Sequence, residues 1–462
     1  MFDPVAIEGF DEHIMITSDI IEVLKQHGVM PSKKLGQNFL CDANVARWIV
    51  EQLDPQPEDT VVEVGPGTGA LTEHLVGRVK RVVLVEFDAR LAEYLTGKFS
   101  DRDDVEVHHF DGARFDVRKL YKHAPIKFLG NLPYSAGGAI MRNFMKSPTP
   151  VVRAVLMLQK EFIDRIVAKH RTKEYGVLSL RMQSEWESKP VKTVPPEAFH
   201  PRPLIDSTVM TCVPSENKEV YDKRLFDELV RRGFSQRRKQ VKKQLPDNAN
   251  WDEVAESLGL PVTARAEEIN LEQWIKITQM YDPHPLKDLP QSDDEIFDVV
   301  DENDVVLRQE KRAVVHAENL LHRAVHVLVF NKKKEVLLQK RSVLKDKCPG
   351  LWDSSAAGHL ESGETYDECA PRELKEELAV DEEVQHIAQL KPCENTGWEH
   401  IGLYVARYDG ALRFPCSEIE HAMWFDMDQL NEWIQARPED FAPGFMECWA
   451  VFYEKFSNYS AE

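Results

Sequence analysis

Short apolar runs rich in β-branched residues alternate with amphipathic stretches between Asp59 and about Lys160. The apolar runs are TVVEVG, RVVLVEFD, VEVHHFDG and IKFLGNLPY, and the amphipathic stretches include ALTEHLVGRV and ARLAEYLTGKF. Alternation of this kind is typical of β-α units that build a parallel sheet. The pattern therefore predicts an α/β domain in the first half of the chain.

The pattern changes twice after this domain. Residues 221–280 lack strand patterns and predict helices, including LFDELVRRGF and WDEVAESLGL, so we expect a small helical subdomain. The stretch YDPHPLKDLPQSDDE (281–295) combines prolines with a run of acids, which is linker composition. Beyond it, HRAVHVLVF, EVLLQKR and HIGLYVARY predict strands and ETYDECAPRELKEEL predicts a helix. We therefore expect a second, α+β domain with a mixed sheet flanked by helices.

These changes divide the chain into five parts: an N-terminal extension (1–16), an α/β domain (17–215), a helical subdomain (216–282), a linker (283–295) and an α+β domain (296–460). A chain of 462 residues is long enough for roughly two to four domains.

Charge is distributed unevenly along the chain. The net charge is −20, and residues 291–462 hold 18 basic and 35 acidic residues, so most of the excess lies in the second half. A near-neutral half with basic clusters can meet a polyanion, whereas a strongly acidic half needs a divalent cation to do so. We therefore assign a nucleic-acid partner to the first half.

The seven cysteines are scattered without C-x-x-C pairs, which favours a reducing compartment. The first residues, MFDPVAIEGFDEH, have neither a basic nor an apolar leader region, and no apolar run reaches 18 residues. The sequence therefore predicts a cytoplasmic protein with no membrane partner.

A glycine-rich turn follows the first predicted strand of the α/β domain. Gly65, Gly67 and Gly69 allow a tight turn and close approach of a ligand, and Glu86 ends the next strand, where its carboxylate can accept ribose hydroxyls. This pair of features indicates a nucleotide-like cofactor, but a dinucleotide-binding domain shares both.

Asp111 and the Asn131-Leu132-Pro133-Tyr134 turn separate the two alternatives, because both follow later strands of the same predicted sheet. Methylation of an exocyclic adenine amine requires acceptors for the amine hydrogens, which Asn131 Oδ1 and carbonyls around Pro133 can provide. Tyr134 offers an aromatic face for a flipped base. We therefore predict Asn131, Pro133 and Tyr134 as catalytic residues.

The first half resembles the KsgA family of ribosomal RNA adenine dimethyltransferases over residues 17–280. The shared stretches are KKLGQNFL (33–40), EVGPGTGALT (63–72), VEFD (85–88), FDGARFD (110–116), GNLPY (130–134), FHPRP..DS (199–207), FSQRRK (234–239) and RAEEINLEQW (265–274). The resemblance implies a Rossmann-like fold, S-adenosylmethionine as cofactor, and dimethylation of two adjacent adenosines in small-subunit (16S) rRNA. The implied cofactor contacts are Asn38, Leu40, Gly65, Gly67, Gly69, Glu86, Asp111 and Asn131.

The resemblance also implies that Phe199 is a second aromatic residue beside the target base, and Leu204 departs from the lysine usual in the family. A basic cluster, which we call the 231–243 cluster, lies in the helical region: Arg231, Arg232, Arg237, Arg238, Lys239, Lys242 and Lys243. Phosphate neutralisation by such a cluster releases counterions. We therefore expect RNA contacts at Arg237, Arg238 and Lys239, in addition to the contact at Phe199 that the resemblance implies. The alternative for this half is a non-catalytic ribosome-assembly factor that binds RNA.

In the acidic half, Gly358, Glu364, Arg372, Glu373, Glu376 and Glu377 follow the spacing G-x5-E-x7-R-E-U-x-E-E-x-G-U. The three last-named glutamates share one helix face, where their repulsion favours a hard divalent cation such as Mg²⁺ that activates water and bridges diphosphate oxygens. This spacing resembles the Nudix box. We predict metal ligands at Glu373, Glu376 and Glu377, with Glu373 also catalytic.

The surrounding sequence resembles the Nudix branch that contains isopentenyl diphosphate isomerases and related hydrolases. Ala357 stands where an isomerase needs a thiol, so we favour hydrolysis of a small-molecule diphosphate and retain an isomerase as the alternative. Pro371 suggests a helix that starts late or kinks, and Ala379 replaces the last glycine of the box. Glu418 or Glu420 is a candidate further base or ligand.

Overall fold

The computed structural model describes residues 17–31, 36–216, 219–283 and 293–456, and the predicted N-terminal extension and most of the linker lie outside them. The chain divides into two compact units, Met1–Asn217 and Lys218–Glu462. The division lies two residues from the expected end of the α/β domain. The helices that follow it group with the C-terminal unit by their contacts.

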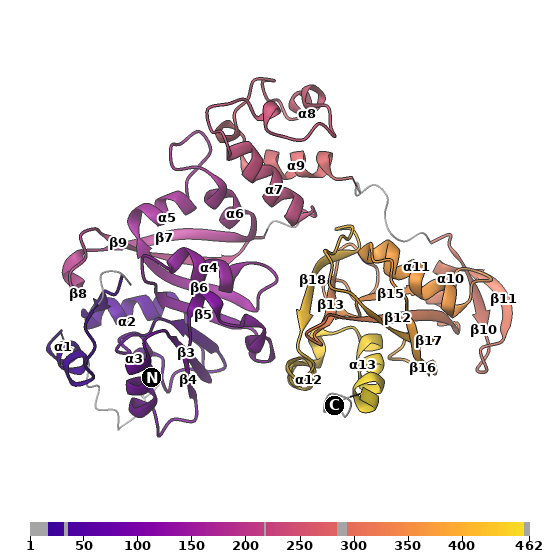
Figure 1. Cartoon of the computed structure of the whole chain (residues 1–462), viewed down its shortest axis with the longest axis horizontal. Helices are drawn as coiled ribbons and strands as arrows, with labels where there is room; N and C mark the ends of the chain where they lie inside the picture. Colours follow the sequence, from indigo (N-terminus) through magenta and orange to yellow (C-terminus); the bar gives the residue numbers. More distant parts are fainter. Residues whose placement is uncertain (1–16, 32–35, 217–218, 284–292, 457–462) are drawn as a thin grey trace, which may run out of the picture. The chain divides into compact units, whose positions relative to one another are not determined.

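The first unit is built on a seven-stranded sheet in the order β4-β3-β2-β5-β6-β9-β7 (Figure 1). Strands β2 to β6 are parallel, and β9 and β7 add an antiparallel edge. The strands are β1 (Phe39–Leu40), β2 (Thr60–Val64), β3 (Arg81–Glu86), β4 (Val105–His109), β5 (Ile126–Asn131), β6 (Val151–Gln159), β7 (Trp186–Val194), β8 (Phe199–His200) and β9 (Ser207–Pro214). The predicted α/β fold is confirmed.

Helices cover both faces of this sheet because successive strand residues point to opposite faces. Val61 and Val82 pack with α2 (Ala43–Gln52) and α3 (Ala89–Lys98), whereas Val62 and Val83 pack with α4 (Gly137–Met145), α5 (Lys160–Ile166) and α6 (Val177–Glu185). Helix α1 (Thr17–Gln26) packs through Ile20 and Leu24 on Phe39 and Leu91. Short 3-10 turns occur at η1 (Thr72–His74), η2 (Gly112–Arg114), η3 (Val117–His123) and η4 (Pro196–Ala198).

One predicted helix of the first unit is wrong. Residues 70–79 have an amphipathic pattern, yet only η1 forms there. Gly77 adopts φ +77°, a left-handed conformation that ends the turn, and the chain enters β3 four residues later.

The second unit begins with three helices, α7 (Lys223–Phe234), α8 (Trp251–Ser257) and α9 (Leu271–Tyr281), with 3-10 turns η5 (Val241–Lys243) and η6 (Ala266–Glu268). Trp274 is fully buried, and a Cβ at Gly233 would lie 2.5 Å from its ring, so a glycine is needed where α7 meets α9. No strand forms among the described residues of 219–283, as the sequence predicts.

The remaining part of the second unit is a mixed sheet with flanking helices (Figure 1). Strand β12 (His322–Phe330) runs parallel to β17 (Glu399–Arg407) and antiparallel to β15 (Ala356–His359), and β13 (Val336–Arg341) pairs with β14 (Trp352–Asp353) and β18 (Ile419–Phe425). Strand β16 (Gln385–Leu390) completes the sheet, and a separate hairpin joins β10 (Ile296–Val300) to β11 (Val306–Lys311). The helices are α10 (Arg312–Ala317), α11 (Tyr366–Leu378), α12 (Met427–Ala436) and α13 (Pro443–Phe456), with one 3-10 turn, η7 (Pro438–Asp440). The predicted α+β fold is confirmed.

Helix α11 does not start late, contrary to one expectation raised by Pro371. The helix begins at Tyr366, because the Thr365 N–H and hydroxyl both donate to Glu368 Oε2, at 3.0 and 2.7 Å. Pro371 therefore lies inside the helix, where it cannot donate to a carbonyl of the preceding turn. Buried residues Cys369, Ala370, Leu374 and Leu378 anchor α11 on the sheet and keep it in place.

Among the described residues, no helix combines the length and the apolar character needed to cross a bilayer.

Ala379 ends α11 in a left-handed conformation, with φ +54° and ψ +36°. In this conformation the Cβ of alanine is close to the backbone, which costs free energy, whereas glycine has no Cβ. We therefore expect Ala379→Gly to stabilise the C-terminal unit by roughly 0.5–1 kcal/mol in urea unfolding. Lys375→Gly, at an exposed position inside the same helix, is the matched control and should cost about 1 kcal/mol. If Ala379→Gly and Lys375→Gly destabilised the unit equally, Ala379 would not be strained at the end of α11.

Candidate functional site

The first unit contains a cavity of about 230 Å³ at the carboxyl ends of β2, β3 and β5. This edge of a parallel sheet is where open α/β domains bind ligands. The lining includes every cofactor contact expected from the sequence except Gly69, namely Asn38, Leu40, Gly65, Gly67, Glu86, Asp111 and Asn131. The structure therefore brings together residues that are up to 93 positions apart.

The glycine-rich turn is held against Glu86. Gly67 N–H donates to Glu86 Oε2 at 3.0 Å, and Asp88 N–H donates to Oε1 at 2.9 Å. Gly65, Gly67 and Gly69 all adopt positive φ, and a Cβ at Gly67 would lie 3.0 Å from the Phe39 ring. Burial raises the pKa of Glu86, and the two backbone donors partly offset this. Gly69 contributes to the shape of the turn rather than to the cavity wall.

Glu63 is a cavity residue that our sequence analysis missed. It lies in β2 and is buried, and its Oε2 accepts the Thr72 hydroxyl at 2.7 Å. Burial raises the pKa of Glu63 to about 7. The available signal was an acidic residue inside the apolar run TVVEVG, since a charge in a buried strand requires a specific partner.

Asn131 is oriented by a backbone contact. Its Nδ2 donates to the Asn38 carbonyl at 3.1 Å, which leaves Oδ1 as the free acceptor of the amide. The Pro133 carbonyl already accepts Ala136 N–H at 3.0 Å and Gly137 N–H at 2.8 Å, at the start of α4. In the part of the chain that the structure describes, no backbone donor reaches the Leu132 carbonyl. The carbonyl available in this turn is thus that of Leu132 and not that of Pro133.

Tyr134 is half-buried in the cavity wall, where its hydroxyl lies 2.7 Å from Ser207 Oγ. Burial raises the pKa of Tyr134, so the phenol stays neutral. Asp111 also lines the cavity, and one of its carboxylate oxygens, Oδ1, accepts Ala113 N–H at 2.9 Å. Residues that do not line the cavity therefore position both groups: Ser207 positions the ring of Tyr134, and Ala113 positions the carboxylate of Asp111.

The expected RNA contacts have different outcomes. Phe199 is only 5% exposed, pairs with Leu40 in the β1–β8 ladder and belongs to the core, so it does not line the cavity. Arg237 is paired with Glu267 at 2.8 Å. Arg238 and Lys239 are exposed, and neither has an ion pair among the described residues.

The 231–243 cluster is less cationic than its sequence suggests. Besides Arg237, three of its members have carboxylate partners: Arg231 with Asp227, Arg232 with Glu228 and Lys242 with Asp252. Each of these partners lies at least four residues away in the sequence. The uncompensated charge of the cluster is therefore concentrated at Arg238, Lys239 and Lys243.

The second unit contains a larger cavity, of about 900 Å³, lined by the box residues of α11. Glu373, Glu376 and Glu377 project from one face of this helix; the side chain of Glu376 is 61% exposed, that of Glu373 is 13% exposed, and Glu377 is buried. The Glu373 carboxylate lies directly against Gly358, and a Cβ at this position would displace it. The acidic face of α11 thus lies against strand β15.

Arg372 holds the box glutamates in place. Its guanidinium donates to both oxygens of Glu364, at 2.7 and 2.8 Å, and to Glu373 Oε1 at 2.8 Å and Glu376 Oε2 at 3.2 Å. Its Nη2 also donates to the His359 carbonyl at 3.1 Å. A planar guanidinium suits several carboxylates at once, so Arg372 positions them without removing all of their negative charge.

Burial raises the pKa of Glu373 to about 7 and that of Glu377 to about 8, and the repulsion between the neighbouring carboxylates adds to this rise. Glu377 Oε2 accepts Ala357 N–H at 3.1 Å and Gln339 Nε2 at 3.2 Å. Glu418, paired with Lys345, lines the same cavity, whereas Glu420 pairs with Lys340 and does not. The structure therefore selects Glu418 from the two candidates, and the surplus of acids is suited to a cation.

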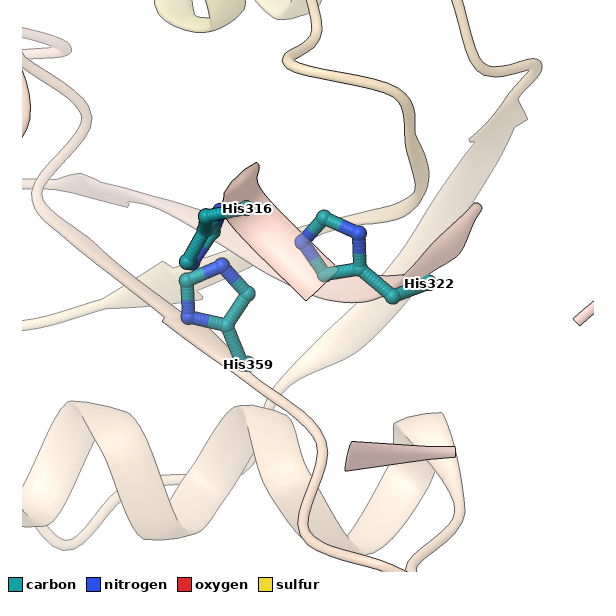
Figure 2. Close-up of side chains that lie close together, drawn as sticks. All are labelled: His316, His322 and His359. Atoms are coloured by element: carbon teal, nitrogen blue, oxygen red, sulfur yellow. The ribbon is translucent and has the colours of Figure 1, made fainter. Parts of the chain in front are cut away.

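Sequence analysis also missed a histidine cluster, of which His316 and His359 line this cavity. Ligand atoms of His316, His322 and His359 lie within 4.8 Å of one another (Figure 2). The three residues come from α10, β12 and β15. Their spacing in the sequence is irregular, so only the fold reveals the cluster.

Two family models match the chain. The model described as ribosomal RNA adenine dimethylase matches residues 31–282, and the NUDIX domain model matches residues 320–445. Both matches cover the motifs that the geometry brings together. The resemblance to the isopentenyl diphosphate isomerase branch is not confirmed by these two matches.

Curated relatives agree with the first match. The chain is 34% identical over 259 residues to the ribosomal RNA small subunit methyltransferase A of Chlorobium phaeobacteroides, covering 56% of this chain and 94% of that protein. It is 36% identical over 250 residues to the protein of the same name from Chromobacterium violaceum, and the match covers 54% of this chain and 94% of that protein.

Solved structures also resemble parts of the chain. A dimethyladenosine transferase from Plasmodium falciparum is 22% identical with a TM-score of 0.45, covering 52% of this chain and 95% of that chain. The DR0079 protein from Deinococcus radiodurans is 28% identical with a TM-score of 0.28, and the match covers 31% of this chain and 90% of that chain.

The family match covers more than half of the chain, and a second enzyme domain follows it. The chain therefore belongs to the ribosomal RNA adenine dimethylase family of S-adenosylmethionine-dependent methyltransferases, and it is a fusion of such an enzyme with a Nudix hydrolase domain.

Proposed function

We propose that the first half dimethylates the N6 amines of two adjacent adenosines in small-subunit rRNA. The observation that carries the proposal is the orientation of Asn131, whose Nδ2 is engaged by Asn38 and whose Oδ1 is left as an acceptor. S-adenosylmethionine supplies an electrophilic methyl group when it is bound. The buried carboxylate of Glu86 fits the ribose of such a cofactor, and the half-buried carboxylate of Asp111 fits its adenine.

The residues of this half act by positioning. Asn131 Oδ1 and the Leu132 carbonyl accept the two amine hydrogens, which directs the nitrogen lone pair away from them. Tyr134 stacks on the flipped base, and its hydrogen bond to Ser207 fixes the ring. Residues between α7 and η5, chiefly Arg238 and Lys239, contact the RNA backbone. Orientation and electrostatics of this kind account for most of the rate without a covalent intermediate.

Removal of the acceptor tests this proposal. With purified, unmodified small ribosomal subunits and labelled S-adenosylmethionine, Asn131→Ala should lower methyl transfer by about 100-fold or more, since one preorganised polar contact is typically worth that much. Tyr134→Ala should lower transfer more than Tyr134→Phe, because only the alanine removes the stacking face. Exposed Asn44→Ala is the matched control and should retain activity.

The alternative function predicts a different result. If the wild-type protein binds the subunit and transfers no methyl group, the first half is a non-catalytic assembly factor and the proposed methylation is wrong.

For the second half, the proposed activity is cation-dependent hydrolysis of a small-molecule diphosphate. The supporting observation is the set of three box glutamates, two of them (Glu373 and Glu376) held by Arg372, beside a cavity large enough for such a ligand. Mg²⁺, which prefers carboxylate oxygens, supplies charge neutralisation and an activated water when bound. Glu373, Glu376 and Glu377 hold it, and Glu418 faces the same space.

Substitution of the ligands tests this activity. Glu373→Gln and Glu377→Gln should each lower hydrolysis of the best substrate in a nucleoside- and prenyl-diphosphate panel by about 100-fold or more, because a neutral amide cannot replace a carboxylate on Mg²⁺. Glu383→Gln, at an exposed position outside the cavity, is the control. Phosphate release is measured together with isomer formation, and an isomer without phosphate release would establish the isomerase instead.

The raised pKa values of Glu373 and Glu377 predict how stability depends on pH. Because the folded state keeps these protons above the unfolded pKa of 4.5, it binds more protons than the unfolded state up to pH 7 to 8. Without a divalent cation, the stability of the C-terminal unit should therefore fall as pH rises from about 5 to 8, by at most about 1.4 kcal/mol per pH unit and per group.

Mg²⁺ should restore more stability at pH 8 than at pH 6, since it binds the ionised carboxylates. Calorimetry of the full chain measures the unfolding temperature at each pH with and without Mg²⁺. The Ala379→Gly variant identifies the unfolding transition of the C-terminal unit, because it shifts that transition alone. Glu377→Gln should flatten the pH dependence. A stability that rises over this range in wild type would contradict the burial of charge described above.

A further inference from the structure

A hairpin and a short helix precede the Nudix domain and lie outside both matched family models. This segment, residues 293–319, contains β10, β11 and α10, between the match that ends at 282 and the match that begins at 320. Glu295, Phe297, Arg312 and His316 of the segment line the large cavity. The segment is therefore one wall of the site.

The hairpin is attached to the domain through β10, and β11 is its outer strand (Figure 1). Val300 N–H, in β10, donates to the Leu321 carbonyl at 2.9 Å, next to the start of β12. Among the described residues, β11 pairs with β10 alone. Val306 and Leu307, at the start of β11, are 45% and 61% exposed. The second edge of β11 is therefore open.

The alternation of the ladder shows which backbone groups β11 directs outward. Arg312 N–H donates to the Glu295 carbonyl at 2.7 Å, and this pair continues the register in which Gln309 lies opposite Asp298. Hydrogen-bonded and non-hydrogen-bonded pairs alternate along an antiparallel ladder, so Gln309 and Asp298 form a non-hydrogen-bonded pair. The N–H and the carbonyl of Gln309 thus point away from β10. No group of the described residues bonds to either of them.

An open edge of this kind can pair with the same strand of a second copy about a two-fold axis. When the axis passes beside Gln309, the N–H of each Gln309 donates to the carbonyl of the other, and the unbonded groups of both chains are satisfied. Hydrogen-bonded pairs join residues whose backbone groups point outward, and along β11 these are alternate residues. The two strands can therefore slide past one another only two residues at a time.

Charge selects one of these registers. Arg308 and Glu310 flank Gln309 on one face of β11, and Arg308 Nε lies 3.8 Å from Glu310 Oε2. In the register centred on Gln309, Arg308 is opposite Glu310 of the second copy, and the two-fold axis repeats this pair. A slide of two residues puts Arg308 opposite itself in one direction and Glu310 opposite itself in the other. Like charges directly opposite one another are destabilising, so the register centred on Gln309 is favoured.

We propose that β11 is an interface between two copies of this chain, in which the strands pair antiparallel about Gln309 and the two hairpins form one four-stranded sheet. Charged side chains on an open edge oppose pairing with most other strands, whereas here they are complementary. The contact is one short strand on each side, so the dimer is weak and depends on concentration. The interface is independent of both proposed activities, because it uses none of the residues assigned to them.

Pairing also bears on the hydrolase cavity. Gln309 Nε2 donates to Ser362 Oγ, and the Ser362 hydroxyl donates to Asp298 Oδ1 at 2.7 Å. Ser362 belongs to the loop between β15 and α11, and this residue lines the cavity. The strand that pairs with a second copy is thus in direct contact with the wall of the site.

The first experiment measures association of the full-length protein. Sedimentation velocity over roughly 1 to 100 μM, a range that covers weak association, should show a monomer–dimer equilibrium. Gln309→Pro should weaken association at least about tenfold, because proline removes the outward N–H and leaves the ladder with β10 intact. Gln309→Ala is the matched control, since it also loses the side chain but keeps the N–H, and it should retain the dimer.

The second experiment exchanges the charges. Arg308→Glu and Glu310→Arg should each weaken association at least about tenfold, because each turns two attractive pairs into two repulsive pairs. An equimolar mixture of these two variants should associate again, since the acidic strand of one copy then faces the basic strand of the other. The ion pair within each strand is not restored in the mixture, so recovery reports the contact between copies. Glu383→Arg, at an exposed position elsewhere, changes the net charge equally and should leave association unchanged.

Calorimetry checks that each variant keeps the unfolding transition of the C-terminal unit. The proposal is wrong if the wild-type chain stays monomeric over this concentration range. It is also wrong if the dimer survives Gln309→Pro, or if the two charge variants do not associate when they are mixed.

Discussion

Burial of carboxylates is the constraint on which both halves of this chain depend. A carboxylate removed from water is stable only beside hydrogen-bond donors, cations or a proton. Glu86 meets this requirement with the N–H groups of Gly67 and Asp88, and Glu63 with the hydroxyl of Thr72. Glu377 uses Ala357 N–H and Gln339. Each of these partners comes from a turn or strand beside the site, so the compensation for the charge also sets the shape of the site.

The two sites meet this constraint to different extents, and their chemistry follows from the difference. In the first unit both oxygens of Glu86 are satisfied by backbone donors, so the carboxylate is suited to bind a polar, weakly charged group. In the second unit Arg372 is shared among Glu364, Glu373 and Glu376, and one positive charge cannot balance three. A remaining negative charge inside a cavity favours a divalent cation. The first site is therefore organised for positioning and the second for metal chemistry.

Residue types and spacing predicted most of the fold and both sites. The β-branched runs predicted β2 to β5, and the box spacing predicted the face of α11, since both depend on local periodicity. Predictions failed where distant contacts decide. Residues 70–79 have a helical pattern, but Gly77 ends the turn after η1. The pairing of Phe199 with Leu40 places this residue in the core, and its contact with the target base stays a prediction. The sequence also could not show that Glu267 neutralises Arg237.

The same reasoning explains why the histidine cluster could not be found from spacing. His316, His322 and His359 come from three elements, so only the packing of α10 against β12 and β15 brings them together. Spacing motifs detect ligands on one helix or one turn, because local geometry is then fixed by the chain itself. The hard-cation site of α11 is of that kind. A cluster assembled across elements requires the fold first, and here it also requires a segment that precedes the matched NUDIX domain. The wall formed by residues 293–319 is therefore as much a part of the hydrolase cavity as the box.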